Sequence, residues 1–162
     1  MYAANKPYPN INVKRRNTDY AKLLLHDYAG INGEDTAIHQ YFYQSLIVPN
    51  KNLSDDLKHI SEVEMKHLDI LGRIIELLGI KPIFGVLGDN SLTPWTAKYI
   101  DYSVKVKDIL IQNIKHERLA IETYQKHIEV IDDEDIKAIL ERIIEDEIVH
   151  IKIFYSYLKK EK

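Results

Sequence analysis

Cysteine is absent from this chain of 162 residues. Disulfide bonds, iron–sulfur clusters and cysteine-ligated zinc sites are therefore excluded, and the absence fits a cytoplasmic protein. The sequence also has no apolar run long enough to span a bilayer, and residues 1–7 lack the apolar stretch of a secretory signal. We therefore expect a cytoplasmic location and no membrane association.

A strong excess of one charge is missing as well. The net charge is −3, and acidic and basic residues are interspersed along the chain. This balance gives no basic surface for nucleic acid, so we expect no nucleic-acid partner. The hydrophobic fraction of 45% is ordinary, and the length is enough for one domain with a buried core.

Four long helical stretches are predicted from the spacing of apolar residues and from capping signals. They cover residues 17–48, 54–79 and 95–131, and a last stretch runs from an Asp132-Asp133 cap to residue 159. Residues 1–16 are polar and contain two prolines, which predicts an extended N-terminal arm. Residues 80–95 are rich in glycine, proline and small polar residues, which predicts a loop.

The lengths of the connections indicate the topology. The first two and the last two stretches are joined by only a few residues, so each pair should form an antiparallel hairpin. The middle connection is much longer, and a helix of 25–30 residues is about 40 Å long. We therefore predict an all-α four-helix bundle, in which one long crossover joins the two hairpins.

Six acidic and imidazole side chains repeat at a fixed offset of 83 positions. Each set consists of a Glu-x-x-His pair and a lone glutamate 30 positions before it. The first set is Glu34, Glu64 and His67, and the second set is Glu117, Glu147 and His150. All six lie near the midpoints of the predicted helices, on seams where apolar residues are expected.

This pattern predicts a dinuclear metal site. Buried carboxylates without partners cost several kcal/mol each, and two divalent cations would offset the charge of four. Carboxylate and imidazole ligands suit iron, manganese or zinc. The alternative is that the six are solvated charges on helix surfaces, but two complete sets at one offset argue against it.

The same residues resemble a known superfamily. Residues 34–42 resemble the first helix of bacterioferritins, and residues 64–69 resemble their second. Residues 141–150 resemble the closing helix of bacterioferritins and rubrerythrins, while the Gly33-Glu34 start and residues 41–45 also resemble manganese catalases and related spore-coat proteins. The resemblance covers residues 17–160 and implies a ferritin-like domain over residues 17–162, after the arm of residues 1–16.

The resemblance implies a site of two iron ions, with two manganese ions as the alternative. In the family Glu64 and Glu147 would bridge the metals. The implied activity is an oxidoreductase of ferroxidase or peroxidase type that reduces O2 or hydrogen peroxide, with electrons from Fe(II) or a redox protein. The alternatives are iron storage, a structural role, manganese catalase, or an oxygenase acting on an organic substrate. We expect a homodimer or a larger homo-oligomer.

Three further residues are candidates for supporting the site. Tyr41 and Tyr124 are also 83 positions apart, and their hydroxyls could donate to a ligand carboxylate, although core tyrosines can bond any buried acceptor. The resemblance implies that Asp146 supports His67, whereas the equivalent position in the other repeat is Val63, which cannot. The alternative for Asp146 is an exposed aspartate.

The remaining candidates are weaker. Met65 corresponds to the methionine that binds haem in bacterioferritins, but we favour an ordinary surface methionine and do not expect haem. The other histidines lack paired spacing and are expected on the surface or flanks of the helices, with His127 as the exception. These residues are His26, His39, His59, His116 and His127.

Overall fold

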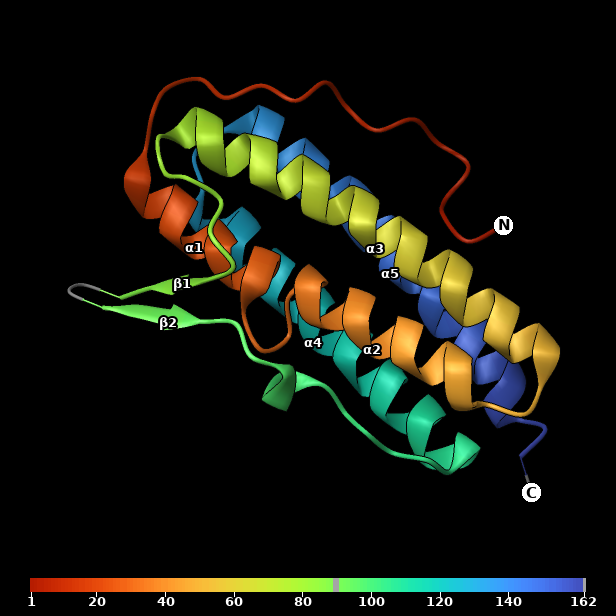
Figure 1. Cartoon of the computed structure of the whole chain (residues 1–162). Coiled ribbons are helices and arrows are strands. Elements are labelled where there is room, and N and C mark those ends of the chain that lie inside the picture. The colour runs from red at the N-terminus through yellow and green to blue at the C-terminus, as the bar shows by residue number, and fades with distance from the viewer. Residues whose placement is uncertain (89–90, 162) are drawn as a thin grey trace.

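The computed structural model describes residues 1–88 and 91–161, and it shows two helical hairpins packed side by side (Figure 1). The helices are α1 (Thr18–Ala29), α2 (Glu34–Ile47), α3 (Lys51–Leu78), α4 (Val106–Val130) and α5 (Glu134–Leu158). Helices α1 and α2 follow each other along one line and together form the first long rod of the bundle (Figure 1). The predicted all-α four-helix bundle is confirmed.

The prediction of one continuous helix over residues 17–48 is wrong. The chain turns between α1 and α2, where the Gly30 amide donates to the His26 carbonyl and the Gly33 amide donates to the Gly30 carbonyl, each at 3.0 Å. A side chain at Gly33 would meet the Asp27 carbonyl at 2.6 Å, so only glycine fits this turn. As a result Glu34 is the first residue of α2, not a residue at the middle of a long helix.

The crossover is longer than expected and spans residues 79–105. Gly79 ends α3 in the left-handed conformation, with φ 107°, as its position predicted. A short antiparallel pair, β1 (Gly85–Leu87) and β2 (Leu92–Pro94), and the 3-10 helix η1 (Ala97–Tyr99) follow.

The predicted helix start at Trp95 is therefore wrong by eleven positions, since α4 begins at Val106. The Trp95 indole donates to the Thr36 hydroxyl at 2.9 Å, and the Asp101 amide donates to the Gln40 side chain at 2.9 Å. These bonds hold the segment against α2. The start of α3 was also misplaced: Asn50, not Ser54, caps it by accepting from the Leu53 amide.

The core consists of two hydrophobic layers with a polar layer between them. One layer joins α1 to the end of α3 and the start of α5, and includes Leu24, Ile74 and Leu140. The other joins α2 to the start of α3 and the end of α5, and includes Leu57 and Phe154. The middle residues of α3, α4 and α5 lie between these layers, where water is excluded and polar interactions are strong.

The N-terminal arm, residues 1–16, contains no helix or strand and runs along the outside of α3 and α5 (Figure 1). Asp133 caps α5 by accepting from the Asp135 and Ile136 amides, and its other oxygen accepts from the Lys14 amide at 2.7 Å. The arm is therefore fixed to the bundle near its C-terminal end, and its first residues reach the middle of α5.

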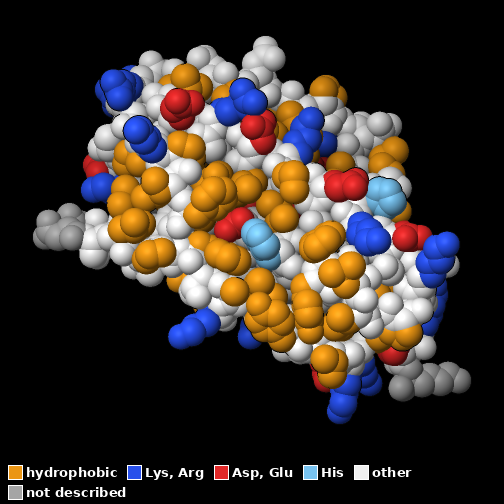
Figure 2. All heavy atoms as spheres, viewed as in Figure 1, with side chains coloured by type: hydrophobic (Ala, Val, Ile, Leu, Met, Phe, Trp, Pro, Cys, Tyr) orange, Lys and Arg blue, Asp and Glu red, His pale blue; other side chains and the backbone are white. Residues whose placement is uncertain are grey.

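Several large apolar side chains are exposed, among them Phe42, Leu46, Met65 and Phe84. Figure 2 shows hydrophobic side chains gathered over the face that α1 and α2 present. The expected oligomer stays a prediction. No helix within the described ranges has the length and apolar character that a membrane crossing needs.

Candidate metal centre

The structure brings all six repeated side chains together in the polar layer. Each is at most 4% exposed. Their ligand atoms form two groups, within each of which the atoms lie no more than 4.8 Å apart. The His67 half-site is Glu34, Glu64, His67 and Glu147, and the His150 half-site is Glu64, Glu117, Glu147 and His150.

In the His67 half-site the imidazole directs its Nδ1 atom at three carboxylates. The Nδ1 atom lies 2.9 Å from Glu64 Oε2, 3.2 Å from Glu147 Oε1 and 3.6 Å from Glu34 Oε2. These three glutamates come from α3, α5 and α2, so the half-site draws on both hairpins.

The His150 half-site repeats this arrangement. Its Nδ1 atom lies 3.0 Å from Glu64 Oε1, 2.9 Å from Glu147 Oε2 and 3.5 Å from Glu117 Oε1. Each of the two shared carboxylates, Glu64 and Glu147, thus turns one oxygen to each half-site. A carboxylate placed in this way can bridge two cations.

The outer nitrogen of each imidazole has its own partner. His67 Nε2 lies 3.1 Å from Asp146 Oδ2, and His150 Nε2 lies 2.9 Å from the Tyr2 carbonyl oxygen. A carbonyl oxygen can only accept, so His150 Nε2 carries a proton, and a carboxylate favours the same state in His67. In the neutral imidazoles the lone pair is then on Nδ1, directed into the cluster, which is the form that binds metal.

Tyr41 and Tyr124 donate to glutamates of the opposite repeat. The Tyr41 hydroxyl donates to Glu117 Oε1 at 2.6 Å, and the Tyr124 hydroxyl donates to Glu34 Oε1. Both tyrosines are at most 2% exposed, and burial, followed by the nearby carboxylates, raises the pKa of each well above its ordinary value. The two hydroxyls therefore stay protonated and orient the two unshared glutamates.

Asp146 is fully buried rather than exposed. It accepts from Arg142 at 2.5 Å, from the Ala4 amide at 2.6 Å and from the Tyr8 hydroxyl at 2.5 Å, in addition to His67. Burial alone would raise the pKa of Asp146, but the hydrogen bonds from His67 and Tyr8 lower it to about 2. Asp146 is therefore a charged acceptor for the outer nitrogen of His67.

The cluster as a whole retains protons. Burial raises the pKa of Glu34 to about 8 and also raises that of Glu117. For both imidazoles the surrounding carboxylates outweigh burial and raise the pKa well above the ordinary value. Burial would raise the pKa of Glu64 too, but the two imidazoles outweigh it and lower that pKa. Cations that bind here must compete with these protons.

The donor set fits a pair of divalent cations. Four buried atoms of the six clustered side chains have no hydrogen-bond partner among the described residues: both Glu64 oxygens, Glu147 Oε1 and His67 Nδ1. Buried polar atoms without partners are costly, and one cation in each half-site would satisfy all four. Oxygen and imidazole ligands without thiolate suit manganese, iron or zinc.

Two histidines outside the cluster are buried, one against the prediction and one in agreement with it. His116 is only 9% exposed, so its expected surface position is wrong, and neither of its ring nitrogens has a hydrogen-bond partner among the described residues. His127 is buried, as its place on the helix seam suggested, and its Nδ1 atom lies 2.6 Å from Asp27 Oδ2. Neither histidine belongs to the two half-sites.

The sequence did not identify the residues of the arm that reach the site, because contacts across such separations leave no spacing signal. Tyr2 and Tyr8 belong to this group, and Arg142 of α5, which donates to Asp146, was missed as well. A buried amide network on the other side was missed too: Gln40 and Gln44 donate to Asn113 at 3.1 and 3.0 Å. Here a signal existed, since Asn113 interrupts the apolar seam of its helix.

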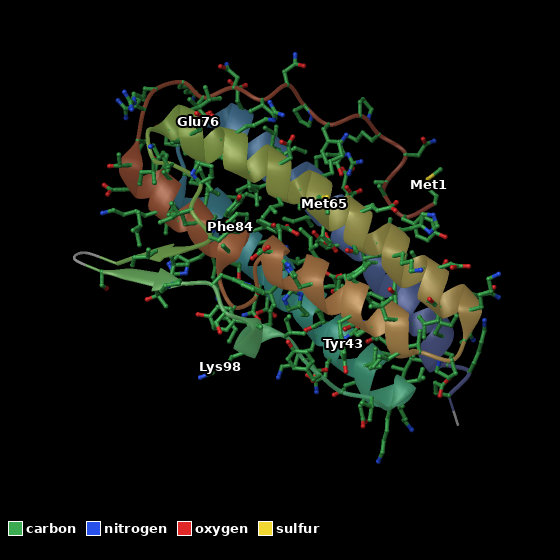
Figure 3. All side chains as sticks on the ribbon, viewed as in Figure 1. Met1, Tyr43, Met65, Glu76, Phe84 and Lys98 are labelled. Carbon is green, nitrogen blue, oxygen red and sulfur yellow. The ribbon has the colours of Figure 1, made fainter. Side chains whose placement is uncertain are left out.

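Met65 takes no part in the cluster. It lies midway along α3 (Figure 3) and is 57% exposed. This exposure is that of a surface methionine, which was the preferred interpretation. Haem binding stays untested.

Two carboxylate-rich half-sites buried between four helices define a ferritin-like dimetal carboxylate protein. The family described as "Ferritin-like domain" matches residues 29–162. This range covers most of the chain, and the protein belongs to that family.

Within the family the chain is similar to named proteins over most of its length. It is 28% identical over 170 residues to the probable manganese catalase of Clostridium acetobutylicum, with 94% of this chain and 76% of that protein covered. It is 29% identical over 184 residues to Protein CotJC of Bacillus subtilis, with 100% and 96% covered.

Solved structures of ferritin-like proteins are similar to this chain over most of its length. The crystal structure of KatB, a manganese catalase from Anabaena, superposes with a TM-score of 0.87 at 29% identity and covers 99% of this chain and 80% of that one. The bacterioferritin of Desulfovibrio desulfuricans matches with a TM-score of 0.72 at 24% identity, over 87% and 78% of the two chains. That second likeness shows a shared fold alone.

Proposed function

We propose that this protein is a dimanganese catalase, which converts two molecules of hydrogen peroxide into two of water and one of dioxygen. The observation that carries the proposal is the pair of half-sites with two shared carboxylates and two inward-facing Nδ1 atoms. The similarity to manganese catalases supports the choice of metal and substrate.

The sequence first suggested a di-iron ferroxidase or peroxidase, with manganese catalase as an alternative. The relatives support the alternative better. Two manganese catalases match nearly the whole chain at 28–29% identity, whereas the likeness to bacterioferritin, at 24%, carries only the fold.

The ligands divide into shared and unshared groups. Glu64 and Glu147 would bridge the two ions, Glu34 and His67 would complete one coordination sphere, and Glu117 and His150 would complete the other. Four carboxylates balance the charge of two divalent cations. A bound manganese pair supplies Lewis acidity and a two-electron redox couple, which is what the alternate reduction and oxidation of peroxide requires.

The chain itself orients the ligands and excludes bulk water. Tyr41 and Tyr124 hold the unshared glutamates, and Asp146 and the Tyr2 carbonyl fix the outer nitrogens of the imidazoles. The hydrophobic layers above and below keep water away from the charged cluster, so the ligand charges act at low local dielectric.

The test compares protein loaded with manganese and protein loaded with iron. Dioxygen release is followed with an oxygen electrode, without any electron donor. We expect one dioxygen per two peroxide molecules from the manganese form. We expect Glu64→Gln to lose metal and turnover together, while the control Glu76→Gln, exposed on the same helix (Figure 3), retains both.

Two results would contradict the proposal. One is peroxide consumption that requires an external electron donor. The other is rapid dioxygen uptake by the iron form with an inactive manganese form, which would restore the di-iron oxidoreductase.

A second candidate is a structural role in which the metal pair mainly ties the bundle together. It is favoured by the composition of the half-sites, since one links α2 and α3 to α5 and the other links α3 to α4 and α5. A large rise in melting temperature on loading, together with no peroxide turnover, would support this role instead.

A further inference from the structure

We propose that the N-terminal arm positions the imidazoles of both half-sites and makes the two half-sites unequal in their hold on metal. This inference rests on the proposed metal site, but not on the proposed reaction. It concerns residues 1–8, which lie outside the bundle and contribute none of the six ligands.

The contact with the His150 half-site is direct. The backbone carbonyl of Tyr2 accepts the Nε2 proton of His150 at 2.9 Å. The Tyr2 side chain fixes this carbonyl in two ways: its hydroxyl donates to Asp56 at 2.8 Å, and its ring stacks on the His59 ring, with centroids 4.6 Å apart and planes within 3°. The other Asp56 oxygen accepts from Tyr157 at 2.6 Å.

The contact with the His67 half-site passes through Asp146. The Ala4 amide and the Tyr8 hydroxyl both donate to that carboxylate, and the Tyr8 oxygen also lies 3.2 Å from His67 Nε2. Arg142 closes the network, because it donates to Asp146 and to the Lys6 and Ala4 carbonyls at 2.9 and 3.0 Å.

The two outer nitrogens therefore have acceptors of different charge. The offset of 83 relates Asp146 to Val63, and a valine side chain cannot accept a hydrogen bond. The Tyr2 carbonyl takes the place of the missing carboxylate at His150. An imidazole that donates to a carboxylate is a more basic ligand than one that donates to a neutral carbonyl.

Two consequences follow for metal binding. The His67 half-site, supported by a buried carboxylate, should hold its cation more tightly. The His150 half-site depends on the position of one backbone carbonyl, so it should be sensitive to any change that releases the first residues of the arm.

The test is release of manganese to excess EDTA from the full-length protein loaded with two ions per chain. Tyr2→Ala removes both the hydroxyl and the ring that fix the carbonyl. We expect one ion per chain to leave about tenfold faster, in keeping with the loss of an outer partner of a ligand, and the second ion to leave at the wild-type rate. Tyr2→Phe keeps the stacking and should restore most of the slow release.

The matched control is Tyr157→Phe, which removes the other donor to Asp56 and leaves the arm untouched.

A second measurement uses the metal-free protein. Nitrogen-15 NMR of the histidines should show faster solvent exchange of the His150 Nε2 proton in Tyr2→Ala, with His67 unchanged. A change that merely loosened the fold would alter both imidazoles and lower the melting temperature of the metal-free protein.

The inference is overturned if Tyr2→Ala releases both ions at wild-type rates. It is also overturned if both ions leave faster in parallel and the metal-free melting temperature falls. If the wild-type protein binds two ions and Tyr2→Ala gives either of these results, only the inference fails and the proposed function stands. A wild-type chain that takes up no manganese would contradict the function and this inference together.

Discussion

The Tyr41 hydroxyl on α2 donates to Glu117 on α4 at 2.6 Å. The equivalent pair in the repeat, Tyr124 and Glu34, runs in the opposite direction, from α4 to α2. Each hairpin thus orients a glutamate of the other hairpin. Loss of one hydroxyl should therefore affect mainly the half-site that contains the glutamate to which it donates.

Tyr41→Phe should therefore weaken manganese binding at the His150 half-site about tenfold and cost about 1 kcal/mol of folding stability. The hydroxyl is lost while the ring still fills its buried site. Competition with a chromogenic chelator measures the affinity, and Tyr43→Phe, half-buried on the same helix (Figure 3), serves as the control. Equal affinities in the two variants would refute the role of the hydroxyl.

Asp146→Asn should weaken binding at the His67 half-site roughly 10–100-fold, because the outer partner of His67 loses its charge. It should also lower the free energy of unfolding by about 3 kcal/mol, since Arg142 stays buried beside a neutral side chain. Chelator competition and urea unfolding test the two effects. The control is Asp69→Asn, which removes an exposed partner of Arg73.

The metal-free protein should lose stability as the pH rises from about 5 to about 8. Burial raises the pKa of Glu34 from 4.5 to about 8, so the folded state binds this proton more tightly than the unfolded chain. That contribution is complete below the ordinary pKa and is lost as the pH approaches 8. His67 and His150, whose pKa values the surrounding carboxylates raise despite burial, act in the same direction.

Other groups act differently but do not reverse this trend. Burial lowers the pKa of His116, so this one histidine makes the folded state more stable as the pH rises, against the trend of the other three groups. The lowered pKa of Asp146 gives stability that is lost only below its ordinary value of 3.8, outside this pH range. The loaded protein should show the opposite slope, because metal ions compete better as protons leave. Thermal melts of both forms at several pH values provide the measurement, and parallel slopes would count against the proton–metal competition.

Gly33→Ala should destabilise the protein by roughly 1–3 kcal/mol and weaken metal binding as well. The added carbon would lie 2.6 Å from the Asp27 carbonyl, so the turn between α1 and α2 must shift, and Glu34 is the next residue. Gly88→Ala is the control, since its nearest contact would be 3.4 Å away. Calorimetry and metal titration together would show whether strain at the turn reaches the site.

The sequence predicted the features that depend on local pattern. The four-helix bundle and its hairpin topology follow from periodicity and loop length, although the break between α1 and α2 was not predicted. The six clustered side chains follow from interruptions of apolar seams. The start of α4 was misplaced because Pro94 and Trp95 have the features of a helix start, whereas the indole is held by Thr36. The contact between Tyr2 and His150 could not be predicted, because a backbone carbonyl 148 positions away has no side-chain signature.

Each half-site takes ligands from both hairpins, and this constrains the order of events in the cell. A nascent chain that has formed only α2 and α3 displays two glutamates and one histidine, with neither half-site complete. Since Glu147 belongs to both half-sites, neither can be finished before α5 has left the ribosome. Acquisition of metal should therefore be a late step, which protects the growing chain from capture of the wrong ion.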